Sequence, residues 1–182
     1  MASFDDPSRW TMLNLFRSGI RVNPKTRSRP KPSGSVSLKN VIPYVGTKSL
    51  LLQFLHEGIS LPMVYQVDLM WSGCEFVNED PRDLRNWMKV SYKDFHVWVR
   101  KPDISRNTVR VRCACPDFYF TYAYQDWQQG ALFGSKPKPY VRKTLHYPRR
   151  NPHNYAGCCK HIANSVAFSQ NAGWGYPSPR LF

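Results

Sequence analysis

Four residues in the second half of the chain have the side chains and the spacing of a metal site. Cys113 and Cys115 form a Cys-x-Cys pair, and Cys159 and His161 form a Cys-x-His pair much later in the chain. Three thiolates and one imidazole make a complete tetrahedral set for a borderline-soft ion such as zinc, and they leave no coordination position open for a substrate. The pattern therefore predicts a structural zinc ion that closes the long loop between the two pairs.

The elements around these residues are expected to bring the two pairs together. Both thiols of the first pair belong to a predicted strand over residues 108–115, in phase with Val109 and Val111, so that all four share the buried face. Cys159 and His161 are expected at the start of an apolar-faced helix, where free backbone N–H groups favour a thiolate. The strand thus supplies two ligands and the helix start supplies the other two.

Cys158 leaves the ligand set open. It could replace Cys159 as the third thiolate, or join three other cysteines in binding an iron–sulfur cluster. Another interpretation is that the thiols are simply buried and the histidine lies at the surface. The chain has five cysteines, and neither a Cys-x-Cys pair nor two adjacent cysteines form a good disulfide within themselves. We therefore favour a metal and expect a reducing compartment.

The order and spacing of the four ligands resemble the SWIM-type zinc finger, whose pattern is Cys-x-Cys, a variable gap and then Cys-x-His on a β-β-α unit. The resemblance covers roughly residues 90–168, and the matching residues are Cys113, Cys115, Cys159 and His161. The gap is longer than in compact members of the family, so we expect the insert to fold over a neighbour. The resemblance implies a zinc finger, and because that family is associated with DNA, RNA and protein contacts, it does not decide the partner.

The charge of the chain favours a polyanionic partner. Lys and Arg number 26 against 12 Asp and Glu, which gives a formal net charge of +14. Such an excess suits nucleic acid, an anionic membrane or an acidic protein surface, although ordinary solvated cations on a basic protein explain it equally well. Ten of the acidic residues lie between Glu57 and Asp126, and none follows Asp126.

Two Pro-rich basic segments, residues 20–45 and the insert at residues 134–156, are expected to be extended arms. Neither has the apolar periodicity to fold against its own domain, so we expect neighbouring chains to hold both. Their cations are the candidate contacts to phosphates or to acidic partner surfaces: Arg21, Lys25, Arg27, Arg29 and Lys31 in the first arm, and Lys136, Lys138, Arg142, Lys143, Arg149 and Arg150 in the insert.

The remaining pattern predicts an α+β fold, with a small antiparallel sheet, packed helices, one zinc-type knuckle and extended basic arms. An N-terminal helix is expected within residues 1–19, opened by Asp6-Pro7 and ended by Gly19, and the α+β domain is expected over residues 46–182. Within that domain we predict a helix over residues 47–56, strands over 63–71, 90–100 and 108–115, a helical turn within 80–88, and a helix that follows Cys159.

The sequence predicts no enzyme. It contains no Gly-rich phosphate loop, no His-Glu-x-x-His and no Gly-x-Ser-x-Gly. Cys159 and His161 are two positions apart, which is a poor arrangement for a nucleophile and its base. The aromatic run over residues 118–127 could stack on the bases of a single strand, but we favour a protein interface. The longest apolar run, at residues 50–55, is too short to span a bilayer.

We therefore expect a non-enzymatic, zinc-stapled structural component of a large assembly, without a small-molecule substrate. A Cys-rich knuckle with Pro-rich arms is similar in style to the small virion proteins of contractile-tailed bacteriophages. That similarity implies a neck, tail or baseplate protein of the virion, assembled in the host cytoplasm, with other protein chains as partners and non-specific contacts to nucleic acid. The alternative is a nucleic-acid-binding SWIM-type zinc-finger protein, cytoplasmic and associated with nucleic acid.

Overall fold

The computed structural model describes residues 10–22, 31–58, 63–92, 95–139, 141 and 150–174. Two antiparallel sheets and several helices form this part of the chain, which is the α+β class that the sequence predicts. The larger sheet has the strand order β1-β2-β3-β7, with β1 at Val36–Val45, β2 at Ser49–Gly58, β3 at Val64–Ser72 and β7 at Thr108–Cys113. The smaller sheet has the order β4-β6-β5, with β4 at Phe76–Val77, β5 at Trp87–Tyr92 and β6 at Phe95–Arg100.

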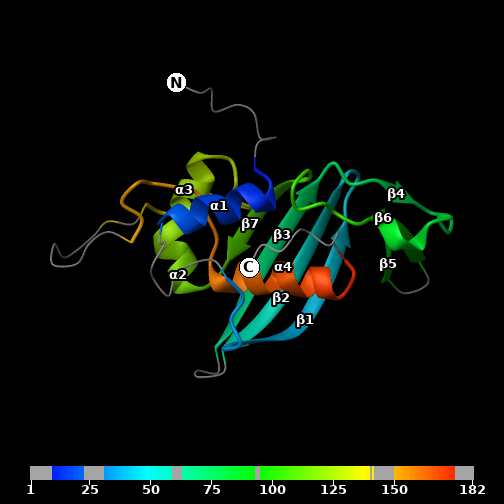
Figure 1. The fold of residues 1–182 in the computed structure, drawn as a ribbon, viewed down its shortest axis with the longest axis horizontal. Coiled ribbons are helices and arrows are strands. Elements are labelled where there is room, and N and C mark those ends of the chain that lie inside the picture. Colours follow the sequence, from blue (N-terminus) through cyan, green and yellow to red (C-terminus); the bar gives the residue numbers. More distant parts are fainter. Residues whose placement is uncertain are drawn as a thin grey trace.

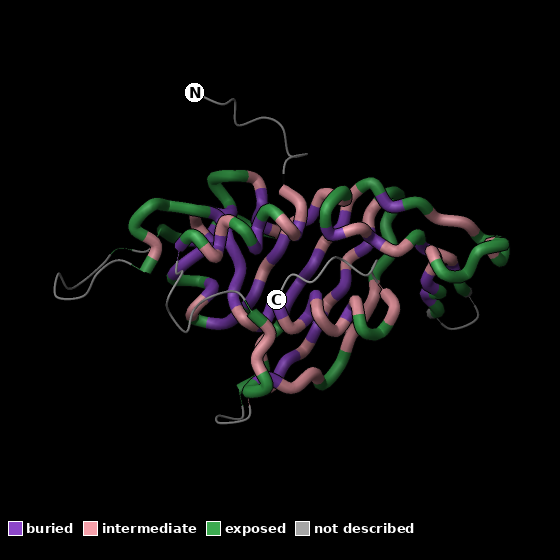
Figure 2. Tube along the Cα trace, viewed as in Figure 1, coloured by how far each residue is buried: buried purple, intermediate pink, exposed green. Residues whose placement is uncertain are grey.

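The larger sheet buries one of its two faces. Leu52 of β2 lies opposite Leu69 of β3, which in turn lies opposite Val111 of β7, and all three side chains are fully buried. Because alternate side chains of a strand point to opposite faces, the residues two positions away join the same apolar layer. Figure 2 shows buried segments running along the central strands and exposed segments in the surrounding loops.

Helix α4, at Lys160–Asn171, crosses this apolar layer (Figure 1). Phe168 of α4 packs edge to face on Phe54 of β2, with ring centroids 6.3 Å apart. Helix α1, at Met12–Val22, buries Met12 and Phe16 in the same core. A helical segment follows β7 and consists of α2 at Pro116–Phe118, a π-helical turn η2 at Tyr119–Ala123 and α3 at Tyr124–Gln128.

The outer edge of β7 is covered by main chain from two distant parts of the sequence. Thr11 forms an isolated bridge with Thr108, and Leu132 forms one with Val111. The guanidinium of Arg112 donates to the carbonyl oxygens of Phe133, at 2.6 Å, and Ser135. The strand that carries the first ligand pair is therefore not a free edge, and the beginning of the basic insert is fixed to the sheet.

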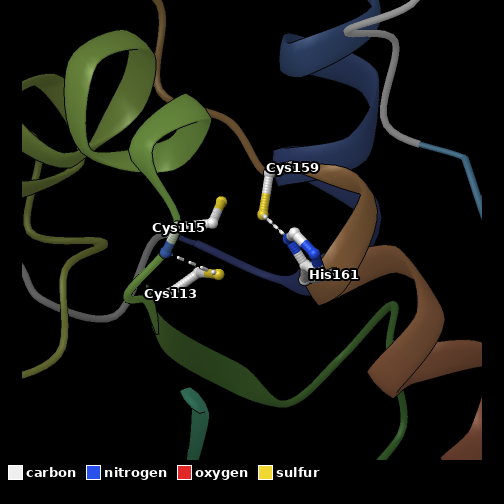
Figure 3. A group of neighbouring side chains, drawn as sticks. All are labelled: Cys113, Cys115, Cys159 and His161. Carbon is white, nitrogen blue, oxygen red and sulfur yellow. Dashed lines mark hydrogen bonds between the residues drawn. The ribbon is translucent and has the colours of Figure 1, made fainter. Parts of the chain in front are cut away.

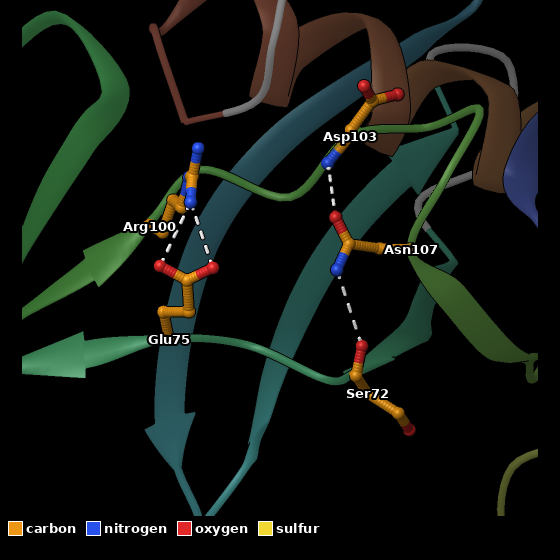
Figure 4. A network of polar contacts seen from close by, with 5 residues as sticks. All are labelled: Ser72, Glu75, Arg100, Asp103 and Asn107. Atoms are coloured by element: carbon orange, nitrogen blue, oxygen red, sulfur yellow. Dashed lines mark hydrogen bonds and ion pairs between the residues drawn. The ribbon is translucent and has the colours of Figure 1, made fainter.

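Polar contacts hold the junction between the two sheets (Figure 4). Arg100, at the end of β6, donates from Nη1 to both carboxylate oxygens of Glu75, at 2.8 and 2.9 Å. In the connection from β6 to β7, the Asn107 side chain accepts from the Asp103 N–H and donates to the Ser72 carbonyl. The 3₁₀ turn η1, at Leu84–Asn86, precedes β5, so a helical turn does occur within residues 80–88.

Two predictions about the front of the domain are wrong. Residues 47–56 form most of strand β2 instead of a helix, and residues 36–45, which we placed in the basic arm, form strand β1. A short run with leucines at successive positions fits a helix and a strand equally well. The pairing of β2 with a neighbour on each side settles the matter, because it buries Leu50, Leu52 and Phe54 and leaves the intervening side chains half-exposed.

The first helix also differs from the prediction. Helix α1 begins at Met12 and continues past Gly19 to Val22, while Asp6-Pro7 lies outside the described residues. Gly19 is buried inside the helix, where a Cβ on Gly157 would lie 3.0 Å from its Cα. It thus permits close packing of two backbones, a use of glycine that looks the same in sequence as a helix stop.

The second half of the domain follows the prediction more closely. Strand β3 and helix α4 confirm the expected strand over 63–71 and the helix after Cys159. The predicted strand over 90–100 is instead parts of two paired strands, β5 and β6. The strand over 108–115 ends two residues early, at Cys113, and the aromatic run at 118–127 is helical.

Candidate metal centre

The ends of three elements meet at the metal centre (Figure 3). Cys113 is the last residue of β7, and Cys115 caps the N-terminus of the short helix α2. Cys159 occupies the N-cap position of α4, and His161 lies in the first turn of that helix. The structure therefore brings together the four residues that the sequence pattern singles out, with the first pair at a strand end and the second at a helix start.

The geometry of the four side chains fits a single tetrahedral ion. One donor atom from each residue lies within 4.8 Å of the others, and all four residues are buried. Two thiolates bound to one zinc ion at about 2.3 Å lie roughly 3.8 Å apart, so the donors need only a small contraction to close on an ion. Cys159 Sγ and His161 Nδ1 are already 3.9 Å apart. The group could hold a metal, and four protein donors fill its shell.

Backbone N–H groups point at two of the sulfurs. The Cys115 N–H donates to Cys113 Sγ, and the Phe118 N–H donates to Cys115 Sγ, each at 3.4 Å. The second contact is a helix N-cap in which a thiol takes the place of the usual Ser or Asp oxygen. Such N–H groups stabilise the thiolate over the thiol, and the thiolate is the form that binds a metal.

The thiols have opposite tendencies to ionise. Hydrogen bonds from Cys113 and Cys159 lower the pKa of Cys115, so this thiol is the first to become a thiolate. Burial raises the pKa of Cys113 and of Cys159 well above the usual value of a cysteine. Three thiolates in one dry cluster would repel each other, and a divalent cation removes that repulsion. Binding of the ion must release protons, so its affinity should rise with pH.

His56 of β2 lies beside the metal centre, and the sequence pattern did not reveal it. Its ring is 6.2 Å from the His161 ring, and its Nε2 is 2.6 Å from Ser165 Oγ, which in turn donates to the His161 carbonyl. Burial, followed by the charge of His161, lowers the pKa of His56 to about 4. The neutral ring therefore braces the first turns of α4. In a strand, His56 shares the buried face with Leu52 and Phe54. Because we predicted a helix over these residues, that alternation did not point to His56.

Cys158 lies outside the ligand group. It is fully buried, and burial together with the nearby Asp126 carboxylate raises the pKa of its thiol well above the usual range. Asp126 also accepts a 2.8 Å hydrogen bond from the Gly157 N–H. The segment that delivers Cys159 to the centre is thus anchored on α3, and Cys158 serves as a core residue at this anchor.

The structure describes only part of the predicted set of basic contacts. Arg21 is in the last turn of α1, and Lys31, Lys136, Lys138 and Arg150 lie in segments without regular structure. The other members of the set lie outside the described residues, namely Lys25, Arg27, Arg29, Arg142, Lys143 and Arg149. No helix of the described part is long and apolar enough to cross a membrane.

A scan against protein-family models found no match to this chain, and searches of curated proteins and of solved structures found no match either. The four-residue cluster is compatible with a zinc finger in its own right. The class of the molecule is therefore defined by its α+β fold and by a buried Cys₃His group that could hold a metal.

Proposed function

We propose that this protein is a non-enzymatic component of a macromolecular assembly, and that a structural zinc ion staples its fold. The observation that carries the proposal is the closed donor set formed by Cys113, Cys115, Cys159 and His161, all buried. A catalytic zinc keeps one position open for water or substrate, and a set of four protein ligands leaves none. The ion would join β7 to α4 and so fix where the sheet and helix meet.

The donor spacing favours one zinc ion over an iron–sulfur cluster. A cluster inserts several irons and sulfides between its ligands, so its cysteines must lie further apart than the ligands of a single ion. Here all four donors lie within 4.8 Å of one another. Three thiolates and one imidazole are also a common structural zinc set.

The finer proposal is a SWIM-type finger in a virion protein of a tailed bacteriophage. Its SWIM part is supported by the order Cys-x-Cys then Cys-x-His on a strand end and a helix start. Its virion part is supported only by the likeness in make-up, a knuckle with Pro-rich basic segments. Other protein chains would be its partners there, with contacts along the insert that begins near Ser135.

Elemental analysis of the purified full-length protein, together with its native mass, tests this function. We expect one zinc per chain and incorporation of the protein into a particle isolated from its source. A folded protein that contains neither zinc nor iron would refute the metal staple. A protein that carries zinc but is found only as a free monomer in its source would leave the staple intact and refute the assembly role.

A further inference from the structure

The helical segment that follows the metal centre carries a row of four rings, three of which are exposed. Tyr119, Phe120 and Trp127 keep 42%, 47% and 37% of their surface exposed. Tyr119 and Phe120 lie edge to face with centroids 5.2 Å apart, and Tyr124 lies 5.8 Å from Trp127. We call these four residues the aromatic row. They sit on one continuous segment, so that the metal-stapled fold holds their positions.

A cation flanks each end of the aromatic row. At the C-terminal end, Lys136 Nζ lies 4.1 Å from the centroid of the Trp127 ring. At the N-terminal end, Arg150 binds Asp117 with a 3.2 Å contact from Nη1. A guanidinium has five N–H donors, so one such contact leaves donors for a further anion.

The two acidic residues of this segment add no free negative charge. Asp117 is paired with Arg150, and Asp126 is fully buried, with a pKa that burial raises well above the usual value. No acidic residue follows Asp126 in the sequence. The segment and the chain that follows it therefore carry a net positive charge, and the charge complement of such a chain is a polyanion.

We propose that the aromatic row, with Lys136 and Arg150, binds single-stranded nucleic acid with little preference for sequence. Ring faces stack on unpaired bases while nearby cations bind the phosphates, and every base has a face to offer. Aromatic residues and arginine are also enriched in protein interfaces, but lysine is depleted there, so Lys136 on the Trp127 ring favours the nucleic acid. A duplex hides its base faces, so it would contact only the cations. This inference uses the metal-stapled fold but is independent of the assembly role.

Fluorescence anisotropy with a labelled oligothymidine of roughly 20 nucleotides, longer than one stacking site, tests the proposal on the full-length protein. Phe120→Ala and Trp127→Ala should each weaken binding by about tenfold, because a stacked ring contributes that much for each base. Lys136→Gln should lower the salt slope of log K by about one, the share of a single phosphate contact. A duplex of the same length should bind more weakly than the single strand.

The smaller sheet offers matched controls. Lys89 Nζ lies 5.7 Å from the centroid of the Trp98 ring, so Lys89→Gln removes an equivalent lysine at a distant place. Leu84 is exposed in η1, and Leu84→Ala removes an apolar side chain there. Neither control should change the affinity for the single strand beyond the error of the measurement. Circular dichroism and zinc content establish that each variant is folded.

Four results would overturn the proposal. Failure of the oligothymidine to bind at physiological salt would leave the row as a surface for protein. Equal affinity of duplex and single strand would show that only charge matters, as would equal competition by polyglutamate. Binding that survives both Phe120→Ala and Trp127→Ala would place the nucleic acid elsewhere on this basic protein. None of these results bears on zinc content or native mass, so they are distinguishable from failure of the proposed function.

Discussion

The two sheets of this molecule are both antiparallel, but different forces hold them in place. The larger sheet is covered by α4, has its β7 edge closed by two distant segments and ends at the metal centre. The smaller sheet buries Val97 and Val99 in the same core cluster, and exposed polar contacts such as Glu75 with Arg100 lie at its junction with the larger sheet. Both sheets share the apolar core, but among the described residues only the larger sheet ends at a group that could hold a metal, while the smaller sheet has surface polar contacts at its edge.

Because of this difference, the contribution of the metal to stability can be separated from that of the apolar core. The ion would join the end of β7 to the start of α4, two elements whose ligands lie far apart in the sequence. No metal-binding group of this kind lies within the described part of the smaller sheet. Loss of the ion should therefore loosen the larger sheet first, and the smaller sheet should respond only through the shared core.

The largest expected effect comes from Cys113→Ser. We expect loss of the ion and several kcal/mol of the free energy of unfolding, because structural zinc contributes on the order of 10 kcal/mol in small modules. Denaturant unfolding and elemental analysis measure both quantities. Amide hydrogen exchange should show lost protection in α4 and β7, with β5 and β6 better preserved. An equal loss of amide protection in both sheets would contradict the expected difference between them.

Two other cysteines serve as controls for this substitution. Cys158 and Cys74 are buried like the ligands but lie outside the ligand group, and Cys74 Sγ donates to the Trp71 carbonyl at 3.8 Å. Cys158→Ser and Cys74→Ser should keep the ion and destabilise the fold by about 1–3 kcal/mol, the effect of burying a hydroxyl in place of a thiol. Loss of zinc from Cys158→Ser would reassign the third thiolate.

Gly157→Ala should have the next largest effect, because it disturbs the segment that delivers Cys159. A Cβ there would lie 2.7 Å from Tyr122 Cε1 and 3.0 Å from the Gly19 Cα. Overpacking of this kind destabilises by about 1–3 kcal/mol. Gly34→Ala is the matched control, since its Cβ would meet nothing within 4 Å. If the unfolding curves of the two variants coincide, the backbone at Gly157 can shift at little cost in free energy.

The metal site could be predicted from the sequence because its ligands are recognisable by residue type and spacing. Two short ligand pairs, one after alternating valines and one before an apolar helical face, were enough to place Cys113 and Cys159 on the correct elements. The residues at which those elements begin and end were harder to predict. Pro116 starts a helix immediately after Cys115, so that Cys115 is a helix cap instead of a strand residue.

The sequence could not show which strands pair with one another. A run of leucines becomes strand β2 only because β1 and β3 lie on either side of it, and such neighbours are set by tertiary contacts. His56 was missed for the same reason, since its burial follows from the phase of β2. Gly19 was interpreted as a helix stop because its contact with the backbone near Gly157 is non-local.

Asp126→Asn should change the pH dependence of the free energy of unfolding. At low pH the free energy of unfolding itself should change much less. Burial raises the folded-state pKa of Asp126, so the folded protein holds this proton more tightly than the unfolded chain does. Its contribution is therefore fully present below the unfolded pKa, near 3.8, and is lost as the pH rises through the folded pKa. Asn keeps an acceptor for the Gly157 N–H and does not ionise.

The difference in unfolding free energy between Asp126→Asn and the parent should thus shift in favour of Asn as the pH rises from 4 to 8. Denaturant unfolding at matched pH values measures it, and the pH dependence of the thiols cancels between the two proteins. A difference that stays constant over this range would mean that Asp126 is already ionised in the folded state at pH 4.

The smallest effect is expected from Glu75→Gln, at the junction of the two sheets. The side chains of Glu75 and Arg100 remain 61% and 49% exposed, so water and salt screen their bidentate contact. Exposed pairs contribute about 0.2–1 kcal/mol. The backbone bond from the Arg100 N–H to the Glu75 carbonyl, at 2.9 Å, survives the substitution and keeps the strand end in place. Unfolding at low and high salt should show a small loss that disappears as the salt concentration rises. If the variant instead loses amide protection throughout β5 and β6, the smaller sheet depends on this one ion pair, and its buried valines are not enough to hold it together.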